Sequence, residues 1–368
     1  MKHLDEFRDP SLAAGLLHEI ADRARRPMTI MEVCGGQTHA IIRYGLDRLL
    51  PENVTLLHGP GCPVCVTPVE LIDAAISISR RPGTILCSFG DMLRVPGSAG
   101  DLLAARAAEG DVRVVYSPLD SLRTAEENPG REVVWFAIGF ETTAPANALA
   151  IHQAAEMGLK NFSVLSAQVL IPPAMAGLVA SGETGIDAFL AAGHVCTIAG
   201  FSDYEKLTSE YNIPVVITGF EPLDILQGIM MAVRQLQEGR SRLENQYTRA
   251  VREEGNPSAL ALVDRVFRVV DRRWRGLGMI PRSGLALHDK YAAYDAARKF
   301  APMVSSSDTS PVCISGSILR GRKKPPDCPA FAVDCTPEHP LGATMVSSEG
   351  ACAAYYRYRG VMHEQKGQ

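Results

Sequence analysis

The stretch VVWFAIGFETTAP, residues 133–145, decides the fold class of this 368-residue chain. Its first six residues are all apolar, with no polar residue at alternate positions, so they predict a strand buried on both faces. Such strands occur almost only in parallel sheets that helices cover on both sides. The Gly-Phe-Glu turn that follows, residues 139–141, ends the run. This stretch therefore predicts an α/β fold.

Seven further short apolar runs extend the pattern outward, each separated from the next by a turn and a helical stretch. They are TIMEV (29–33), VTLLH (54–58), TILCSF (84–89), VRVVY (112–116), FSVLSA (162–167), VCTIA (195–199) and PVVIT (214–218). Their number and spacing predict two parallel-sheet α/β domains with helices on both faces.

The charged, turn-rich segment SLRTAEENPGRE (121–132) is the expected break between these two domains. A long amphipathic helix over 222–239 is expected to close the second. Beyond about residue 275 loops dominate, and the first 26 residues read as a separate helix. The expected domains are residues 27–129, residues 130–238, and residues 1–26 together with 239–368 as a helical and loop-rich unit.

The composition excludes some classes of partner. The net charge is −4 and 46% of the residues are hydrophobic, so the main partner is expected to be neither nucleic acid nor an anionic membrane. No apolar run reaches the roughly 18 residues of a membrane span. The charged start has no apolar core of a secretory signal, so a cytoplasmic protein is expected. No phosphate-binding loop, dinucleotide fingerprint or nucleophile elbow occurs.

Nine cysteines occur, and four of them lie in the loop-rich C-terminal part: Cys313, Cys328, Cys335 and Cys352. A segment so poor in regular structure needs something to hold it, and a metal centre is the natural candidate. Zinc sites usually contain cysteine pairs two to four residues apart, whereas these spacings are wide, which favours a 4Fe-4S cluster. The alternative is four buried cysteines acting as small hydrophobes. Cys87 and Cys196 lie inside apolar runs and read as core.

The segment HGPGCPVCVTP, residues 58–68, carries a close pair, Cys62 and Cys65. Thr67 and Glu70 read as a capping box, which places the pair just before a helix, where the dipole favours a thiolate. A two-residue gap also permits a reversible disulfide. A redox pair is favoured over half of a zinc site or a buried structural pair.

The segment MEVCGGQTH, residues 31–39, places Cys34 at the end of an apolar run and before a helical stretch. Gly35 and Gly36 can form a backbone nest there, where anions and metals are well received. His39 falls in the first turn of the helix. A lone histidine is more often a satisfied polar group than a ligand, but a reactive cysteine nearby improves the case for a functional one.

Three carboxylates directly follow apolar runs: Asp91, Glu141 and Glu221. The carboxyl ends of parallel strands meet at one edge of a sheet, and ligands bind at that edge. The alternative is that each acid caps a helix, where a negative charge suits the dipole.

Together these motifs resemble the hydrogenase maturation family HypD. The matching stretches are MEVCGGQTHAI, LLHGPGCPVC, SFGDMLRVPGS, IGFETTAP, GFEPLDIL and CTPEHPLGATMVSSEGAC. The resemblance implies three α/β-containing domains with a 4Fe-4S cluster in the last, held by Cys313, Cys328, Cys335 and Cys352. It implies that Cys34 is an iron-binding thiol and that Cys62 and Cys65 are a redox-active pair. Some relatives carry His where this chain has Gln37.

The resemblance also implies partners. With the chaperone HypC, such a protein is the scaffold on which transient iron receives two cyanides and one CO, while HypE and HypF supply the cyanide. The finished Fe(CN)2CO unit then goes to the large subunit of a NiFe hydrogenase. The cysteine layout suits an electron relay from the cluster through Cys62 and Cys65 to iron near Cys34. This predicts an assembly scaffold with redox activity rather than a conventional turnover enzyme.

Other residues are expected to support these centres. Asp91, Glu141 and Glu221 are expected to line the cleft or meet a partner, His58 to orient a neighbouring ligand, and Glu349 to tune Cys352. Two competing functions remain open at this point. One is an iron–sulfur thiol-disulfide oxidoreductase, and the other is a zinc-binding interaction module.

Overall fold

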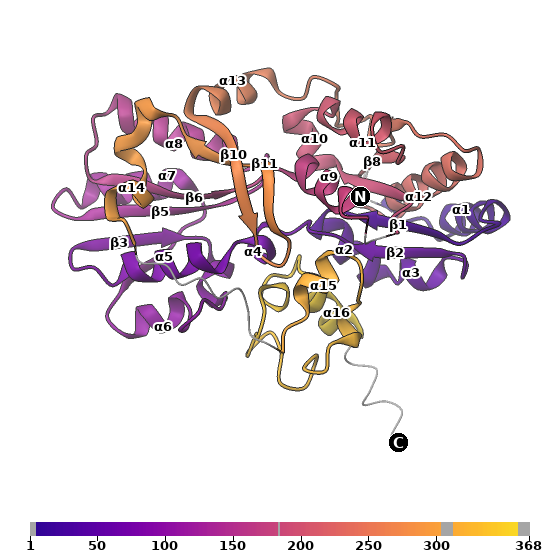
Figure 1. Cartoon of the computed structure of the whole chain (residues 1–368), viewed down its shortest axis with the longest axis horizontal. Helices are drawn as coiled ribbons and strands as arrows, with labels where there is room; N and C mark the ends of the chain where they lie inside the picture. Colours follow the sequence, from indigo (N-terminus) through magenta and orange to yellow (C-terminus); the bar gives the residue numbers. More distant parts are fainter. Residues whose placement is uncertain (1–4, 183–184, 303–311, 360–368) are drawn as a thin grey trace.

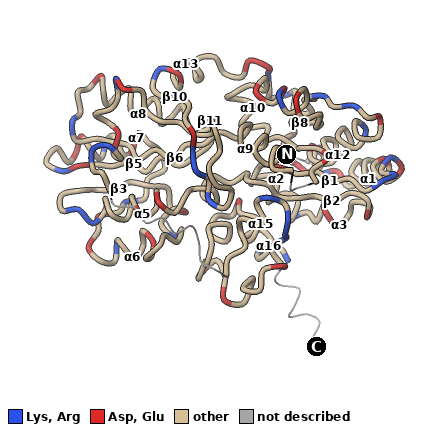
Figure 2. Tube along the Cα trace, viewed as in Figure 1, with Lys and Arg blue, Asp and Glu red and all other residues tan. Residues whose placement is uncertain are grey.

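The computed structural model describes residues 5–182, 185–302 and 312–359. Two β-sheets lie next to each other along the long axis of the molecule, and a smaller loop-rich lobe packs below them (Figure 1). No helix in the described ranges has both the length and the apolar character needed to cross a membrane. Acidic and basic residues are interspersed over the outer helices and loops, so neither sign dominates the view (Figure 2).

Sheet A has five parallel strands in the order β2-β1-β7-β8-β9. Their bounds are β1 (Met28–Glu32), β2 (Val54–His58), β7 (Ala188–Ala192), β8 (Val215–Thr218) and β9 (Leu243–Asn245). The register of β1 and β2 sets Glu32 opposite His58 at the carboxyl edge of the sheet.

Sheet B has four parallel strands in the order β4-β3-β5-β6. Their bounds are β3 (Thr84–Ser88), β4 (Asp111–Val114), β5 (Glu132–Gly139) and β6 (Phe162–Gln168). Every residue of β5 after Glu132 is buried, as the apolar run in this strand predicts.

Helices cover both faces of both sheets, which confirms the predicted α/β architecture. On sheet A, one face packs against α1 (Pro10–Arg23), α2 (Gly35–Tyr44), α3 (Leu46–Leu49) and α12 (Pro222–Gln237), and the other against α9 (Ile171–Ala180), α10 (Gly193–Ala199) and α11 (Glu205–Ser209). On sheet B, one face packs against α5 (Val69–Ser79), α6 (Leu102–Ala107) and α14 (Ala296–Phe300), and the other against α7 (Pro118–Glu127), α8 (Ala144–Glu156) and α13 (Pro257–Val266).

The amphipathic helix expected near residues 222–239 is α12, with Pro222 at its first position. Ile225, Ile229 and Val233 on its apolar face have no exposed surface. Burial of each such side chain contributes about 1.5–3 kcal/mol, so this face fixes α12 on sheet A.

The strands are not divided between the sheets at the expected break. Strands β1 and β2 belong to sheet A, and the chain then builds all of sheet B before it returns to sheet A with β7, β8 and β9. Each sheet therefore draws on both sides of the segment 121–132. The N-terminal helix α1 packs on α12 rather than on the C-terminal lobe. Connectivity of this kind depends on strand pairing, which apolar runs do not encode.

Two local expectations were wrong. The run VCTIA (195–199) lies in helix α10, and the strand is the preceding AFLAA, β7. Apolar periodicity does not distinguish a short buried helix from a buried strand, and β7 has no β-branched residue. The expected loop RGLGMIPRSG (275–284) contributes the turn and much of β11 (Gly278–Leu287), which pairs antiparallel with β10 (Phe267–Trp274).

The loop-rich lobe comprises residues 313–359, with α15 (Ser315–Leu319), the 3-10 helix η6 (Ala343–Met345) and α16 (Ala351–Arg359). Its own apolar cluster is small and includes Cys335 and Cys352. The lobe is bound to sheet A because α16 packs on α2. It is bound to sheet B by Arg94, whose guanidinium donates to the carbonyls of Pro337 (3.0 Å) and Val346 (3.1 Å).

Candidate functional site

Cys34 follows β1 and is the N-cap of α2, in extended conformation with φ −146°. The next residue, Gly35, donates its backbone N–H to the carbonyl of Gly61 (2.9 Å). Gly61 has no room for a side chain, since a Cβ there would lie 2.5 Å from the α-carbon of Cys34. Adjacent α-carbons are about 3.8 Å apart, so the α-carbons of Cys34 and Cys62 lie within about 8 Å of each other. The two cysteine motifs therefore form one site at the carboxyl edge of sheet A.

Cys62 and Cys65 are joined by a disulfide, with α-carbons 5.2 Å apart. Cys62 is the N-cap of a one-turn helix, α4 (Pro63–Val66), and its sulfur accepts the backbone N–H of Cys65 (3.2 Å). Both residues are buried, with 3% and 1% of their surface exposed. The pair is thus preformed and shielded from large partners in this state.

The predicted capping box after the pair does not form. Pro68, not Thr67, is the N-cap of α5, and the Thr67 hydroxyl instead donates to the carbonyl of Pro63 (2.9 Å). The reason is that the chain makes the separate turn α4 first, and Thr67 closes that turn. Only α4, which is four residues long, begins at the pair, so the helix dipole at the disulfide is weaker than the sequence suggested.

The Cys34 thiol is almost fully buried, with 1% of its surface exposed. Burial raises the pKa of Cys34, and the nearby carboxylates of Glu32 and Glu349 raise it further, whereas backbone N–H groups of Gln37 and Gly36 lower it. The Cys34 sulfur lies 3.7 Å from Nδ1 of His194, in α10. A metal ion that bound here would displace the thiol proton and remove much of the cost of burying the charge.

Glu32 organises this edge and was missed by the sequence analysis. It is buried, and its carboxylate accepts the backbone N–H of Cys34 (2.8 Å), the Thr38 hydroxyl and Nδ1 of His58 (2.7 Å). The other His58 nitrogen lies 3.4 Å from the hydroxyl of Tyr355 in α16. An acid inside the apolar run TIMEV was the available signal, because a buried charge needs partners. His58 is thus tied to the Cys34 turn, as expected for an orienting residue.

His39 and Gln37 lie on different sides of α2. His39 contacts the Tyr358 hydroxyl (3.0 Å) and lies 3.5 Å from the carbonyl of Ser348, so it contributes to docking the C-terminal lobe on α2. Gln37 is buried, and its amide nitrogen donates to carbonyls at the ends of β7 and β8, those of Ala191 and Thr218 (both 3.2 Å). Its side chain therefore fixes α2 on the edge of sheet A.

Of the four candidate carboxylates, two lie toward Cys34. Glu349 packs on Gly35, where a Cβ would be 2.8 Å from the Glu349 carbonyl. Burial raises the pKa of Glu349, and the charge of Asp91 raises it further, so Asp91 lies within electrostatic reach of Glu349. Glu349 was expected to tune only Cys352; the structure brings it to the thiol of Cys34 as well.

The other two carboxylates make structural contacts. Glu221 is the N-cap of α12 and pairs with Arg8 (2.5 and 2.9 Å). Glu141 is buried, and Oε1 accepts the backbone N–H of Ile171 at the start of α9 (2.9 Å). Both contacts match the helix-capping alternative for acids that follow strands.

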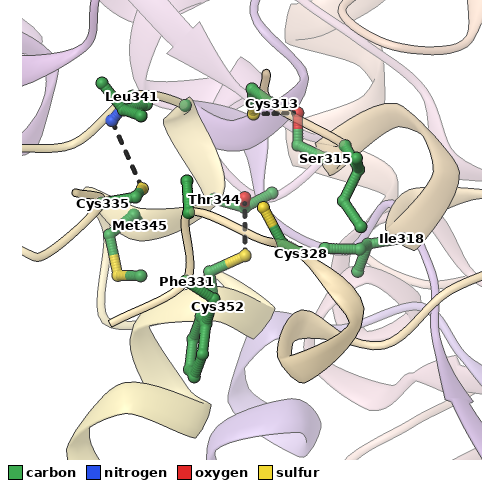
Figure 3. Close-up of a pocket in the computed structure, with 13 residues that line it drawn as sticks. Cys313, Ser315, Ile318, Cys328, Phe331, Cys335, Leu341, Thr344, Met345 and Cys352 are labelled. Carbon is green, nitrogen blue, oxygen red and sulfur yellow. Dashed lines mark hydrogen bonds between the residues drawn. The ribbon is translucent and has the colours of Figure 1, made fainter. Parts of the chain in front are cut away.

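The four C-terminal cysteines line one small pocket in the loop-rich lobe (Figure 3). They come from separate segments: Cys313 before α15, Cys328 after a 3-10 turn, Cys335 in a loop and Cys352 in the first turn of α16. The remaining lining is mainly apolar, with Ile314, Ile318, Ala330, Phe331, Leu341 and Met345 around the sulfurs.

The pocket fits a bound multi-atom centre. Gly342 lies against Cys313, and a Cβ at Gly342 would overlap the Cys313 sulfur, so a side chain there would fill the space. The Cys335 sulfur accepts the backbone N–H of Leu341 (3.4 Å) and the Cys352 sulfur the Thr344 hydroxyl (3.1 Å), which are donors that suit thiolates. Burial raises the pKa of Cys352 to about 12, so the thiol stays protonated unless a metal takes the proton's place.

Within residues 5–182, 185–302 and 312–359, no three His, Cys, Asp or Glu donors converge closely enough to hold a single metal ion. A tetrahedral zinc needs thiolates about 2.3 Å from one point. A tetrahedral zinc and a 4Fe-4S cluster would both need the sulfurs of all four cysteines that line this pocket.

Comparison with known proteins gives a consistent result over nearly the whole chain. The model of the family described as HypD, hydrogenase formation hypA family, matches residues 11–359. Hydrogenase maturation factor HypD2 of Bradyrhizobium diazoefficiens is 52% identical over 377 residues, covering 100% of this chain and 99% of the relative. HypD of Azotobacter vinelandii is 51% identical, covering 97% of each chain, and HypD of Escherichia coli is 46% identical, covering 98% of each.

Proposed function

We propose, from the premise that this chain belongs to the HypD family of hydrogenase formation proteins, that it is the scaffold on which the Fe(CN)2CO unit of a NiFe hydrogenase is assembled. The observation that carries the proposal is the single site formed by Cys34 and the Cys62–Cys65 disulfide, held together by the Gly35–Gly61 backbone bond.

Each part of this site has a role in the proposal. Cys34 supplies a soft thiolate, which suits iron that carries CO and cyanide. Glu32 holds the Cys34 backbone in place, and Glu349 and His194 lie close enough to influence the thiol. The Cys62–Cys65 pair gives up two electrons when its two thiols close to a disulfide and release two protons. The site therefore combines an iron-binding group with a two-electron store.

Cys313, Cys328, Cys335 and Cys352 are the residues that would hold a 4Fe-4S cluster. Such a cluster transfers single electrons when bound. Helix α16 carries Cys352 at its start and Tyr355, which contacts His58, one turn later. The chain thus links the pocket in the lobe to the Cys34 edge through one short helix, which supports an electron route between them.

Two other functions receive less support. An oxidoreductase for external protein disulfides needs an accessible sulfur, whereas Cys62 and Cys65 are both buried. A zinc-binding interaction module usually contains cysteine pairs two to four residues apart, and Cys313, Cys328, Cys335 and Cys352 include no such pair. We propose that the working partners are the chaperone HypC, the cyanide suppliers HypE and HypF, and indirectly the hydrogenase large subunit.

The test is anaerobic purification of the chain together with HypC, followed by iron, acid-labile sulfide and infrared analysis. The expected result is a protein with cluster iron and sulfide that also shows CO and cyanide stretching bands. Cys34→Ala is expected to lose the infrared bands and keep the sulfide, whereas Cys352→Ser is expected to lose the sulfide. Cys87→Ala is the control, because this core thiol lies outside both sites.

Some outcomes would contradict the proposal. If the infrared bands persisted in Cys34→Ala, a residue other than Cys34 would have to bind the iron of the Fe(CN)2CO unit. A protein that turns over external disulfides and never shows CO or cyanide bands with HypC, HypE and HypF present would favour the oxidoreductase. A colourless protein that holds zinc would favour the interaction module.

A further inference from the structure

The first described residues form a short segment that contacts the turn between β8 and α12, at the Cys34 edge of sheet A. We call residues 5–8 the N-terminal strap: the 3-10 turn Asp5–Phe7 and Arg8. The strap ends at Asp9, whose side chain caps α1 by accepting the backbone N–H of Ser11 (2.7 Å). Because α1 packs along α12, the strap has a fixed attachment on one side.

One contact joins the strap to the turn between β8 and α12. The Arg8 guanidinium donates to both carboxylate oxygens of Glu221, at 2.5 and 2.9 Å. Both side chains are partly exposed, 41% for Arg8 and 22% for Glu221. Ion pairs as exposed as this one are weak and are screened by salt. This end of the strap is therefore a releasable contact.

A second contact is an aromatic stack around Arg249. The guanidinium lies 4.0 Å from the ring centroid of Phe7 and 4.3 Å from that of Tyr247. It also donates to both oxygens of Asp224 (2.7 and 2.6 Å), a side chain with no exposed surface. Phe7 thus packs on the guanidinium of Arg249, which is itself bound to Asp224 of α12.

The same elements carry the side chain that covers Cys34. Phe220 lies between Gly219 and the strap's partner Glu221, and its ring packs edge-on against Tyr247. On the other side its ring lies 5.2 Å from the ring of His194, which contacts the Cys34 sulfur. A Cβ on Gly36 would lie 3.3 Å from Phe220 and 3.6 Å from the Cys34 sulfur. Phe220, His194 and Gly36 therefore enclose the thiol together.

We propose that the N-terminal strap positions Phe220 as a cover over Cys34, and that release of the Arg8–Glu221 contact opens the thiol to what binds there. This inference depends on the proposed function in one respect only, namely that the species which reaches Cys34 is an iron species. The turn 219–221 has internal supports as well, since Gly219 accepts a side-chain bond from Gln37 and donates its N–H to Gln246. The strap adds a further support of this turn, the Arg8–Glu221 ion pair, which is exposed enough to be released.

The experiment measures how fast iodoacetamide alkylates Cys34 in the full-length protein, followed by mass spectrometry of the peptide that contains it. Arg8→Ala is expected to raise this rate about two- to fivefold, as loss of an exposed ion pair allows, while Arg8→Lys is expected to keep most of the protection. Phe7→Ala is expected to raise it as well. Added salt is expected to speed alkylation of the wild type more than that of Arg8→Ala.

Two controls keep the outcome decisive. Arg298→Ala removes a more exposed ion pair, with Asp289, beside sheet B and is expected to leave the Cys34 rate unchanged. The buried core thiol Cys87, followed in the same samples, reports general loosening. Unchanged alkylation in both Arg8→Ala and Phe7→Ala would overturn the proposal, as would a parallel rise at Cys87. The assay needs no hydrogenase partner, so its result stands apart from the infrared test.

Discussion

Glu141 shows what a single residue contributes at the start of a helix. It directly follows Phe140 after β5, and its Oε1 accepts the first free N–H of α9. Its Oε2 is buried and has no hydrogen-bond partner among the described residues. Burial raises the pKa of Glu141 to about 7. A carboxyl in this setting keeps its proton at pH values where an exposed glutamate has lost it.

The pH dependence of stability follows from this shift. Between about pH 4.5 and 7 the folded protein holds a proton on Glu141 that the unfolded chain has released, so raising the pH favours unfolding. The stabilisation from the neutral form is fully present below about pH 4.5 and is lost as the pH rises through about 7. Over that window the free energy of unfolding is expected to fall by up to about 3 kcal/mol on account of Glu141.

Glu141→Gln tests this at the same residue. The amide keeps an oxygen for the Ile171 N–H but cannot ionise, so the variant is expected to lose less stability than the wild type between pH 5 and pH 8. Urea unfolding at both pH values measures the difference, and Glu126→Gln, at an exposed position of α7, is the matched control. Equal pH slopes in wild type and Glu141→Gln would contradict the assignment.

At the scale of elements, the contact between two turns decides the geometry of the site. Gly61 lies so close to the backbone of Cys34 that a methyl group would overlap backbone atoms of Val33 and Cys34, which directly follow β1. Gly61→Ala is therefore expected to separate the Cys62 loop from the Cys34 turn and to reduce stability by about 1–3 kcal/mol. Hydrogenase activity in a strain that depends on this chain is expected to fall sharply.

The control for that prediction is Gly15→Ala. Gly15 lies inside α1 with nothing within 4 Å of the added carbon, so the substitution is expected to stabilise the protein by about 0.4–1 kcal/mol. Urea unfolding and the complementation assay compare the two variants. If Gly61→Ala were as stable and as active as the wild type, close packing of the two turns would not be needed.

The elements themselves were largely predictable. Seven of the eight expected runs are strands, because a short stretch such as VVWFAI, apolar on both faces and rich in β-branched and aromatic residues, favours a covered parallel sheet. The basic stretch 265–275 is mostly β10, where basic and apolar residues alternate as they do in a half-exposed strand. The prediction that Thr67 is a helix N-cap was wrong, because the Thr67 hydroxyl donates to the nearby carbonyl of Pro63 instead.

The site was predictable in its cysteines but not in the residues around them. Cysteine spacing identified Cys62 and Cys65, the position of Cys34 between an apolar run and a helical stretch identified that thiol, and the structure brings the two motifs together at one sheet edge. His194 and Phe220 reach Cys34 from α10 and from the turn before α12, across strand pairings between β1, β7 and β8 that no local pattern specifies. Contacts of this kind, between residues far apart in the chain, could not be predicted from the sequence alone.

At the scale of the whole molecule, Arg94 holds the loop-rich lobe against sheet B. Its two bonds to backbone carbonyls add to an apolar contact, since Ala343 and Val346 of the lobe pack in the same cluster as the core of sheet B. Hydrogen bonds from a charged donor contribute about 1.5–3 kcal/mol each. Arg94→Met is therefore expected to speed amide hydrogen exchange in residues 313–359 at least tenfold, with the strands of both sheets unchanged.

Hydrogen–deuterium exchange with mass spectrometry measures this prediction segment by segment. Arg106→Met is the control, since Arg106 lies exposed on α6, away from the lobe. Equal exchange of the lobe in Arg94→Met and wild type would show that the packing of α16 on α2 is sufficient. Faster exchange throughout both sheets would mean that Arg94 supports the entire fold.

The path of the chain through its two sheets also sets the order in which a ribosome can complete them. Strands β1 and β2 leave the exit tunnel first, yet β1 finds its second neighbour, β7, only after every strand of sheet B has been made. Sheet B, from β3 to β6, is contiguous and can close during synthesis. The face of β1 and β2 that packs against α9, α10 and α11 stays uncovered in the meantime, so nascent chains that pause after residue 168 still expose it and are prone to aggregation.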